Sequence, residues 1–318
     1  MQQSNNKTKM SGIQFDPDRD IPVLSGKVIL ITGGNSGLGK ESILQLAKHD
    51  PANIFMGARS EPRAREAIED IKKIVPNAKV QFLQLDLSSF DSVRNAANQV
   101  LASSERLDVL MNNAGIMATP AAVTKEGYEI QFGTNHMGPA LLTKLLLPLL
   151  ERTAARPDGD VRIINLSSNA ADNQAPKEGL ILSDVKSPML AISTWARYGQ
   201  SKIANVYFTQ QLAKRYPQIK SVAIHPGIVN TNLTSGPKQS FKIMIPILFV
   251  VSRLFFTHVK DGVLNQLWAA TAKSEDVKQG GFYYPVGVEF KGKPILASEK
   301  LSDALWDFTE KEIKAHGY

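Results

Sequence analysis

The feature that most constrains this fold is an alternation of short apolar runs with stretches of helical length, repeated six times between Lys27 and His225. The runs that we interpret as strands are VILIT (28–32), NIFMGA (53–58), KVQFLQLD (79–86), LDVLMNN (107–113), DVRIINLS (160–167) and KSVAIHP (220–226). Most of them are continuously apolar, which is typical of strands buried on both faces of a sheet. Helices are expected between them, at 37–49, 62–75, 89–103, 126–151 and 195–215. This alternation predicts a parallel sheet with right-handed crossovers.

The chain outside this region extends the same architecture. A helix is expected at 262–271 and a last strand at 281–284. No linker or fixed-period repeat divides the chain, so residues 21–318 are predicted to form one α/β domain with a Rossmann-type, doubly wound parallel sheet of six to seven strands. Residues 1–20 are polar and lack the apolar core of a secretory signal, and we expect a disordered tail there.

Composition excludes several classes of function. The chain has no cysteine, which rules out disulfide scaffolds, cysteine-ligated metals and thiol nucleophiles. A net charge of +7 suits a phosphate-bearing ligand or an anionic membrane surface, but the cations are spread along the chain, and no nucleic acid partner is expected. His136 and His225 lack the spacing of metal ligands, so both are expected to be structural and no metal site is predicted.

A glycine-rich turn, TGGNSGLG at 32–39, follows the first strand directly. Glycines let the backbone turn tightly and approach a pyrophosphate without an intervening Cβ, and the next helix points its free N–H groups at the anion. The spacing is neither the G-x-G-x-x-G fingerprint nor a P-loop, because G-K-[ST] is missing. Taken alone, the glycine turn could have a purely structural role, as a tight connection between a strand and a helix.

Two residues at strand ends bear on the choice of dinucleotide. Arg59 follows the second strand, where an acid selects a free ribose 2′-hydroxyl and an arginine accommodates a 2′-phosphate, so Arg59 favours NADP(H) over NAD(H). A solvated arginine at a helix start is the alternative, and nearby Glu61 leaves the preference open. Asp86, at the end of the third strand, either contacts adenine or caps the helix that begins near Ser88.

The most specific chemical signal is YGQSK at 198–202, inside an expected helix. Tyr198 and Lys202 are four residues apart and share a helix face, with Cβ atoms about 5–6 Å apart. A cation beside a phenol lowers the phenol pKa from about 10 toward working pH, which makes the pair competent for proton transfer. Taken alone, this spacing is more often a surface pair.

Other chemistry-bearing residues follow neighbouring strands. The fifth strand ends in Ser167 and Ser168, at the carboxyl edge of the sheet, where ligands of such sheets bind. In the helix expected at 126–151, Pro139 has no N–H, so the carbonyl of Asn135 loses its helical partner. We expect a kink there and a carbonyl able to hold a water, with a purely packing kink as the alternative.

Taken in order, these motifs resemble the classical short-chain dehydrogenase/reductase family. The matching elements are TGGNSGLG (32–39), NNAG (112–115), Asn135, Ser168, YGQSK (198–202) and HPGIVNT (225–231). The amino-acid sequence at 132–138, 198–216 and 221–227 most resembles that of the retinol-dehydrogenase-like and WW-domain-oxidoreductase-like branch. The resemblance implies a catalytic tetrad in which Tyr198 is the general acid/base and Lys202 lowers its pKa and holds the nicotinamide ribose. It further implies that Ser168, rather than Ser167, polarises the substrate oxygen, and that Asn135 completes the tetrad through a water.

The resemblance also implies a binding site for NADP(H). Its expected residues are Gly33, Asn35, Ser36, Gly37, Leu38, Gly39, Arg59, Asp86, Leu87, Asn113, Ala114, Gly115, Tyr198, Lys202, Pro226, Gly227, Val229 and Thr231. The expected activity is hydride transfer between NADP(H) and a lipophilic carbonyl or alcohol. A catalytically silent, NADP-binding interaction or regulatory protein is the alternative, although all four tetrad residues are present. An extended-type reductase would need more chain after Thr231.

Residues 232–260 are expected to determine the substrate. The largely apolar part, 236–257, would form a lid over the site, a membrane-facing segment flanked by Lys242 and Arg253, or a helix that closes the core. A lid of this kind predicts a lipophilic substrate. The absence of an apolar run of 18 residues and of a signal favours a cytoplasmic protein, with peripheral attachment to a membrane or lipid droplet and formation of a homodimer left open.

Overall fold

The sheet is parallel and has seven strands in the part of the chain that the structure describes. The computed structural model describes residues 12–227 and 258–318, and its strands follow the order β3-β2-β1-β4-β5-β6-β7. Their bounds are β1 Val28–Thr32, β2 Asn53–Ala58, β3 Val80–Gln84, β4 Val109–Asn112, β5 Arg162–Leu166, β6 Lys220–Ile224 and β7 Phe282–Tyr283. All neighbouring strands run parallel. The order reverses between β1 and β4, which makes this the switch point where such sheets bind ligands.

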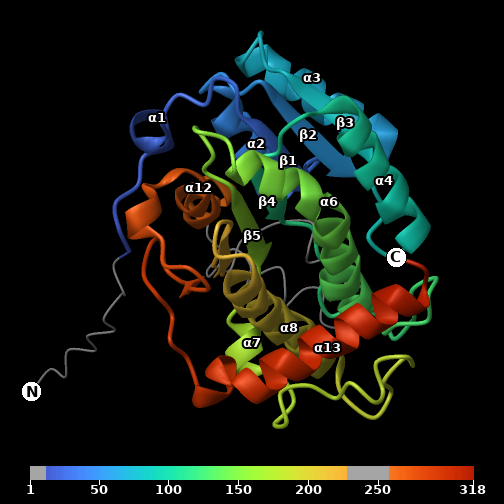
Figure 1. Cartoon of the computed structure of the whole chain (residues 1–318). Coiled ribbons are helices and arrows are strands. Elements are labelled where there is room, and N and C mark those ends of the chain that lie inside the picture. Colours follow the sequence, from blue (N-terminus) through green and yellow to red (C-terminus); the bar gives the residue numbers. More distant parts are fainter. Residues whose placement is uncertain (1–11, 228–257) are drawn as a thin grey trace, which may run out of the picture.

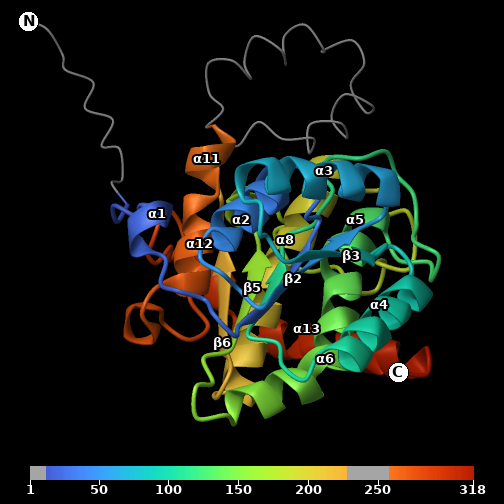
Figure 2. The ribbon, with the colours of Figure 1, turned by 90° about the horizontal axis from the view of Figure 1, so that it is seen from above.

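Helices cover both faces of the sheet, as the two views in Figures 1 and 2 show. One face packs against α2 (Gly37–Ala47), α3 (Glu61–Ile74) and α12 (Leu264–Thr271), and the other against α4 (Phe90–Ser103), α6 (Gly138–Ala154) and α8 (Thr194–Arg215). This coverage explains the continuous apolar runs, since every residue of β1 and of β5 is buried. Shorter elements are α1 Pro17–Asp20, α5 Ile130–Phe132, α7 Ala170–Asn173, α11 Val259–Gly262 and 3₁₀ turns at Ser274–Asp276 and Pro294–Ala297.

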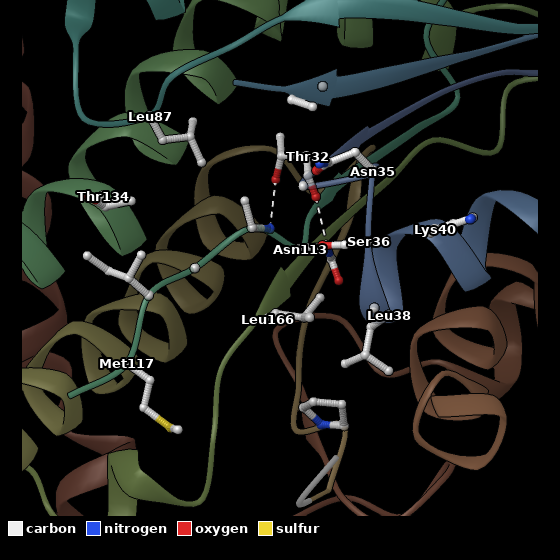
Figure 3. Close-up of a pocket in the computed structure, with 18 of the residues that line it drawn as sticks. Thr32, Asn35, Ser36, Leu38, Lys40, Leu87, Asn113, Met117, Thr134 and Leu166 are labelled. Carbon is white, nitrogen blue, oxygen red and sulfur yellow. Dashed lines mark hydrogen bonds between the residues drawn. The ribbon is translucent and has the colours of Figure 1, made fainter. Parts of the chain in front are cut away.

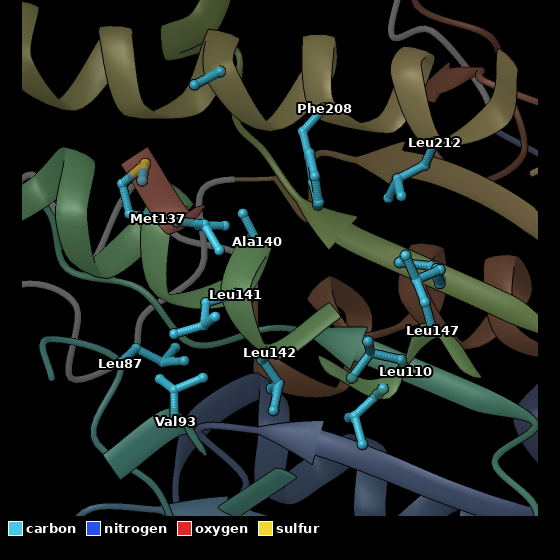
Figure 4. Packing of buried hydrophobic residues seen from close by; sticks show 14 of the residues in the cluster. Leu87, Val93, Leu110, Met137, Ala140, Leu141, Leu142, Leu147, Phe208 and Leu212 are labelled. Carbon is cyan, nitrogen blue, oxygen red and sulfur yellow. The ribbon is translucent and has the colours of Figure 1, made fainter. Parts of the chain in front are cut away.

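The larger apolar core lies between the sheet and the helices α4, α6 and α8. Figure 4 shows Leu110 of β4 facing Leu142 and Leu147 of α6, with Phe208 and Leu212 of α8 beside them. These five side chains are at most 8% exposed. Burial of a leucine or phenylalanine side chain stabilises the fold by about 1.5–3 kcal/mol each, so this layer fixes α6 and α8 against the sheet.

A C-terminal helix, α13 (Glu299–Ala315), packs across α8 and α6 and was not predicted from the sequence. Ser298 caps it by accepting a hydrogen bond from the backbone N–H of Leu301, and Leu305 and Ile313 lie in the core. Trp306 stacks on Phe208 with ring centroids 5.9 Å apart. The helix therefore covers the outer surface of α8 with its own apolar side chains.

The long helix expected at 126–151 is interrupted by a π-helical turn, η1 (Gly133–Met137), between α5 and α6. The N–H of Gly138 donates to the carbonyl of Gly133, five residues earlier. Glycine is needed at both positions, because a Cβ on Gly133 would meet Thr124 and one on Gly138 would meet the Leu87 carbonyl. Irregular helix is therefore present where Pro139 predicted a kink, and π-turns of this kind are frequent at functional sites.

Two boundaries differ from the sequence prediction. Residues 17–20, expected to belong to a disordered tail, form α1, in which the Asp16 side chain accepts from the N–H of Asp18 and Pro17 occupies the first turn. The helix expected at 262–271 is α12, which begins two residues later at Leu264 and follows the separate short helix α11 at Val259–Gly262. Among the described residues, no helix combines the length and apolar character needed to cross a bilayer.

Candidate active site

A cavity of about 1200 Å³ opens along the carboxyl ends of the strands on both sides of the switch point. Figure 3 shows part of its lining, from Lys40 on α2 to Met117 beyond β4. The expected site residues that line it are Gly33, Asn35, Ser36, Gly37, Leu38, Arg59, Asp86, Leu87, Asn113, Ala114, Gly115, Ser168, Tyr198, Lys202, Pro226 and Gly227. Gly39 and Asn135 do not line it, and Val229, Thr231 and the segment 232–257 lie outside the described residues.

The glycine turn between β1 and α2 has the geometry of an anion cradle. Gly33 has a φ of 68°, in the left-handed region that favours glycine, and a Cβ on Gly39 would collide with the Gly33 carbonyl. Ser36 precedes α2 and makes no side-chain cap, which leaves its hydroxyl facing the cavity at the positive end of the helix. The turn is tied to β4, because Asn113 Nδ2 donates to the Thr32 carbonyl at 2.8 Å and the Ala114 N–H donates to Thr32 Oγ1 at 2.9 Å (Figure 3).

Arg59 lies at the far end of the cavity, after β2, together with Arg63. Glu61 is turned along its own helix, where it accepts from Arg65 Nε at 2.9 Å. Among the described residues, no carboxylate lies within ion-pair distance of Arg59 or Arg63. The end of the cavity at β2 therefore carries two guanidinium groups available to an anion.

Asp86 does not cap α4, so that alternative is wrong. Ser89 precedes the helix and its side chain accepts from the N–H of Ser92, whereas Asp86 Oδ1 accepts from the N–H and hydroxyl of Ser88 at 2.9 and 2.7 Å. Asp86 lines the cavity in this fixed orientation, and its contact with adenine remains a prediction.

Three of the four expected catalytic residues meet near the end of β5. Tyr198 and Lys202 lie on consecutive turns of α8, and Ser168 follows β5; all three are at most 8% exposed. The Ser168 hydroxyl donates to Asn169 Oδ1 at 3.3 Å and is near enough to the Tyr198 phenol to affect its pKa. Lys202 Nζ lies 5.7 Å from the centroid of the Tyr198 ring and donates to the Leu166 carbonyl at 2.9 Å. Ser167 donates to the Lys202 carbonyl at 2.8 Å, so Ser168 is the serine next to the phenol.

The prediction that the pKa of Tyr198 is lowered is wrong for this structure, which contains no cofactor. Burial raises the pKa of Tyr198 to about 12 and outweighs the smaller, opposite effect of the neighbouring Ser168 hydroxyl. Burial also lowers the pKa of Lys202 to about 8. The phenol is therefore held in its protonated form at neutral pH, as an acid that donates a proton must be.

Asn135 positions the site through its side chain. Its Oδ1 accepts from the Ile116 N–H at 2.8 Å, and its Nδ2 donates to the Ile116 carbonyl and to Ser201 Oγ, both at 2.9 Å. Ser201 in turn donates to the Tyr198 carbonyl at 2.8 Å. The π-turn is thereby connected to both the loop after β4 and the helix that carries Tyr198, while the role of the Asn135 carbonyl remains a prediction.

Several lining residues were not predicted from the sequence. They are Ile116, Met117 and Thr119 after β4, Thr134 in the π-turn, Asn169 and Gln174 after β5, Trp195 on α8, and His225 after β6. Most of them lie in the segments that follow β4, β5 and β6, and that position is the signal that could have identified them. Within residues 12–227 and 258–318, no group of three His, Asp or Glu side chains could hold a metal ion.

Comparison with known proteins agrees with this geometry. A family model described as short chain dehydrogenase matches residues 27–180. An uncharacterized oxidoreductase of Schizosaccharomyces pombe is 41% identical over 258 residues, covering 80% of this chain and 74% of that protein. A short-chain dehydrogenase/reductase of Aspergillus calidoustus, drtF, is 36% identical over 308 residues, covering 92% and 96%.

Solved structures show the same fold. A protein from Mycobacterium paratuberculosis has a TM-score of 0.71 and 28% identity, covering 93% of this chain and 96% of its own. An NADPH-bound carbonyl reductase from chicken fatty liver has a TM-score of 0.60 and 25% identity, covering 81% and 96%. The chain belongs to the short-chain dehydrogenase/reductase family, a family of oxidoreductases that bind a nicotinamide cofactor. The retinol-dehydrogenase-like branch stays a prediction.

Proposed function

We propose that the protein transfers hydride between NADP(H) and a lipophilic carbonyl or alcohol, with Tyr198 as the general acid/base. The observation that carries this proposal is the buried cluster of Tyr198, Ser168 and Lys202 in the same cavity as the glycine turn. The two parts supply what such a reaction needs, a place for an anionic dinucleotide and a proton donor beside the reacting oxygen.

The residues present fit a dinucleotide. The cradle formed by Gly33, Gly39 and Ser36 would hold the pyrophosphate at the N-terminus of α2. When bound, the nicotinamide ring supplies or accepts the hydride.

The chain's own residues handle the oxygen and its proton. In the reductive direction Ser168 Oγ donates a hydrogen bond to the carbonyl oxygen, and the Tyr198 hydroxyl gives that oxygen its proton. Because its pKa is about 12, Tyr198 carries the proton before reaction throughout the neutral range. Lys202, with a pKa of about 8, keeps a positive charge beside the ring at neutral pH and stabilises the phenolate formed when the proton leaves.

The preference for NADP(H) is proposed from the end of the cavity at β2. Arg59 and Arg63 face the cavity, while Glu61, which could have repelled a 2′-phosphate, is engaged by Arg65. The similarity to an NADPH-bound carbonyl reductase supports the same choice.

A lipophilic substrate is proposed from the opposite end. Ile116, Met117 and Trp195 line the cavity there, near Tyr198. They form an apolar wall around a small number of polar groups, which is the usual composition of a pocket for an apolar small molecule.

The proposal is tested by following absorbance at 340 nm with the purified protein, a panel of apolar ketones and aldehydes, and either NADPH or NADH. We expect at least one carbonyl compound to be reduced, with a higher kcat/KM for NADPH than for NADH. Binding of NADPH without turnover across the panel and with the corresponding alcohols and NADP⁺ would reject the catalytic proposal and favour the silent alternative.

A further inference from the structure

A fully buried glutamine connects the segment after β4 to the first turn of α8. Gln131 lies in α5, is 0% exposed and does not line the cavity. Its Oε1 accepts from the backbone N–H of Ala118 at 2.8 Å. Its Nε2 donates to the backbone carbonyl of Thr194 at 3.0 Å and to the Thr194 hydroxyl at 3.3 Å. One side chain therefore holds together two segments that are distant along the chain.

Both segments contribute side chains to the substrate end of the cavity, which is the part near Tyr198 where a lipophilic substrate was proposed. Met117 and Thr119 flank Ala118 in the sequence, and Trp195 follows Thr194. Met117, Thr119 and Trp195 all line the cavity, and Figure 3 shows Met117 among the lining residues. The glutamine bonds to their neighbours in the chain, so it fixes these three residues without contacting a ligand.

A further hydrogen bond strengthens the same junction. The Thr194 hydroxyl donates to the Thr119 carbonyl at 2.8 Å while it accepts from Gln131. We refer to the four hydrogen bonds that Gln131 and Thr194 make here as the Gln131 bridge. The bridge ties residues 118 and 119 to the residue next to Trp195.

The backbone at Ala118 needs such support. Ala118 has a φ of 48°, in the left-handed region that residues other than glycine rarely adopt, and it is 0% exposed. Backbone strain of this kind persists only where surrounding contacts hold it, and it is concentrated at ligand sites. The bond from its N–H to Gln131 is one such contact. Loss of that bond would leave a buried donor without this acceptor and would let the segment relax.

The loop is also held one residue before Met117. Asn135 Oδ1 accepts from the N–H of Ile116 and Asn135 Nδ2 donates to its carbonyl, while Gln131 holds Ala118. Met117 is therefore anchored through both of its neighbours. Asn135 was expected at the site from the sequence, whereas Gln131 was not.

We propose that Gln131 is a positioning residue for the substrate, because the Gln131 bridge sets the place of Met117 and Thr119 relative to Trp195. The inference rests on the proposed function and extends it to the choice among carbonyl compounds. A small compound occupies only the region around Tyr198 and gains little from these three side chains. A longer compound reaches them, so the contribution of Gln131 grows with the size of the substrate.

The test is the kinetics of NADPH-dependent reduction of straight-chain aldehydes and 2-alkanones of three to eight carbons. The variant Gln131→Met keeps a side chain of similar length and removes its hydrogen bonds. We expect kcat/KM for the longest compounds to fall about five- to tenfold, mainly through KM, as the loss of one hydrogen bond would produce. For the three-carbon compounds kcat/KM should stay within about twofold of the wild type, and the Kd for NADPH should do the same.

A role in folding alone would not produce a loss that depends on substrate length. Equal kcat/KM values for the variant and the wild type, or an equal loss for short and long compounds, would overturn the proposal. If the wild-type protein reduces no member of the series, the proposed function fails and this inference fails with it. That outcome is seen before any variant is made and is distinct from a variant that matches an active wild type.

A matched control removes a second buried glutamine of α8. Gln211 Nε2 donates to Ser302 Oγ at 2.7 Å and to Asp303 Oδ1 at 2.9 Å, and none of these three residues lines the cavity. Gln211→Met should lower the urea midpoint while it leaves the dependence of kcat/KM on substrate length unchanged. A length-dependent loss as large as that of Gln131→Met would overturn the proposal.

Two variants of Thr194 test the bridge from its other side. Thr194→Ser keeps the hydroxyl and should keep the wild-type dependence on substrate length. Thr194→Val removes the hydroxyl from a side chain of the same shape and should reproduce part of the loss for long compounds. This pair decides the question even where Gln131→Met does not fold, since equal kinetics for the serine and valine variants would contradict the proposal.

Discussion

Replacement of Lys202 by methionine is predicted to stabilise the protein at neutral pH while it abolishes turnover. Lys202 is 4% exposed, and its one hydrogen bond in the described structure is to the Leu166 carbonyl. Burial without a carboxylate partner destabilises the charged form of Lys202 in the folded protein. The same burial lowers the pKa of Lys202 to about 8. Methionine has a similar shape and no charge to desolvate.

The magnitude follows from proton linkage. The pKa falls from 10.5 to about 8, and each unit corresponds to about 1.4 kcal/mol, so the buried charge costs about 3 kcal/mol at pH 7. Loss of the hydrogen bond to Leu166 offsets about 1 kcal/mol, which leaves a net gain of about 2 kcal/mol. Because the native state holds this proton less tightly than the unfolded chain, the cost is complete below about pH 8. It disappears as the pH rises toward 10.5, and by pH 9.5 the advantage of methionine should have fallen by about 2 kcal/mol.

Urea denaturation of the wild-type protein and Lys202→Met at pH 7 and pH 9.5, without cofactor, measures this difference. Other titrating groups are common to both proteins and cancel. Lys214→Met, at an exposed position of α8, corrects for the general effect of removing a lysine. A variant that is less stable than the wild type at pH 7, or a stability difference that is the same at both pH values, would refute the argument.

Two other substitutions test the two ends of the cavity. Arg59→Asp should weaken NADPH binding at least tenfold more than NADH binding in fluorescence titrations, because it removes the cation expected to meet the 2′-phosphate and introduces an acid; equal losses would remove the reason for naming NADP. Asn135→Leu removes three hydrogen bonds to Ile116 and Ser201 and should lower the free energy of unfolding in urea by about 2–4 kcal/mol; a loss below about 1 kcal/mol would show that the network does not hold the π-turn.

The strands were the most predictable part of the fold. VILIT and NIFMGA coincide with β1 and β2, because strands buried on both faces must be continuously apolar and the flanking turns are marked by glycine and polar residues. The helix α13 was missed because it lies beyond the alternating pattern. The apolar residues of α13 pack against α6 and α8, and this contact cannot be predicted before those helices have been placed.

Within the site, the sequence identified which residues meet but not their electrostatic state. Placement of Tyr198, Lys202 and Ser168 in one cavity with the glycine turn follows from their positions at strand ends and on one helix face. The direction of the Tyr198 pKa shift depends on how deeply the phenol is buried, and helical spacing carries no information about that. The π-turn at Gly133–Met137 likewise depends on contacts with Thr124 and Leu87, which are distant along the chain or on another element.

The measurement that bears most directly on the proton-transfer role is the turnover of Tyr198→Phe. Phenylalanine preserves the ring, and Ser168 keeps its contacts with Asn169 and the Ala170 N–H, so the fold should lose about 1 kcal/mol at most. With a carbonyl substrate identified from the panel, we expect kcat to fall by a factor of about 10² to 10⁴, with NADPH affinity within about twofold of the wild type. A variant that reduces the substrate at a rate close to that of the wild type would show that the proton comes from another group.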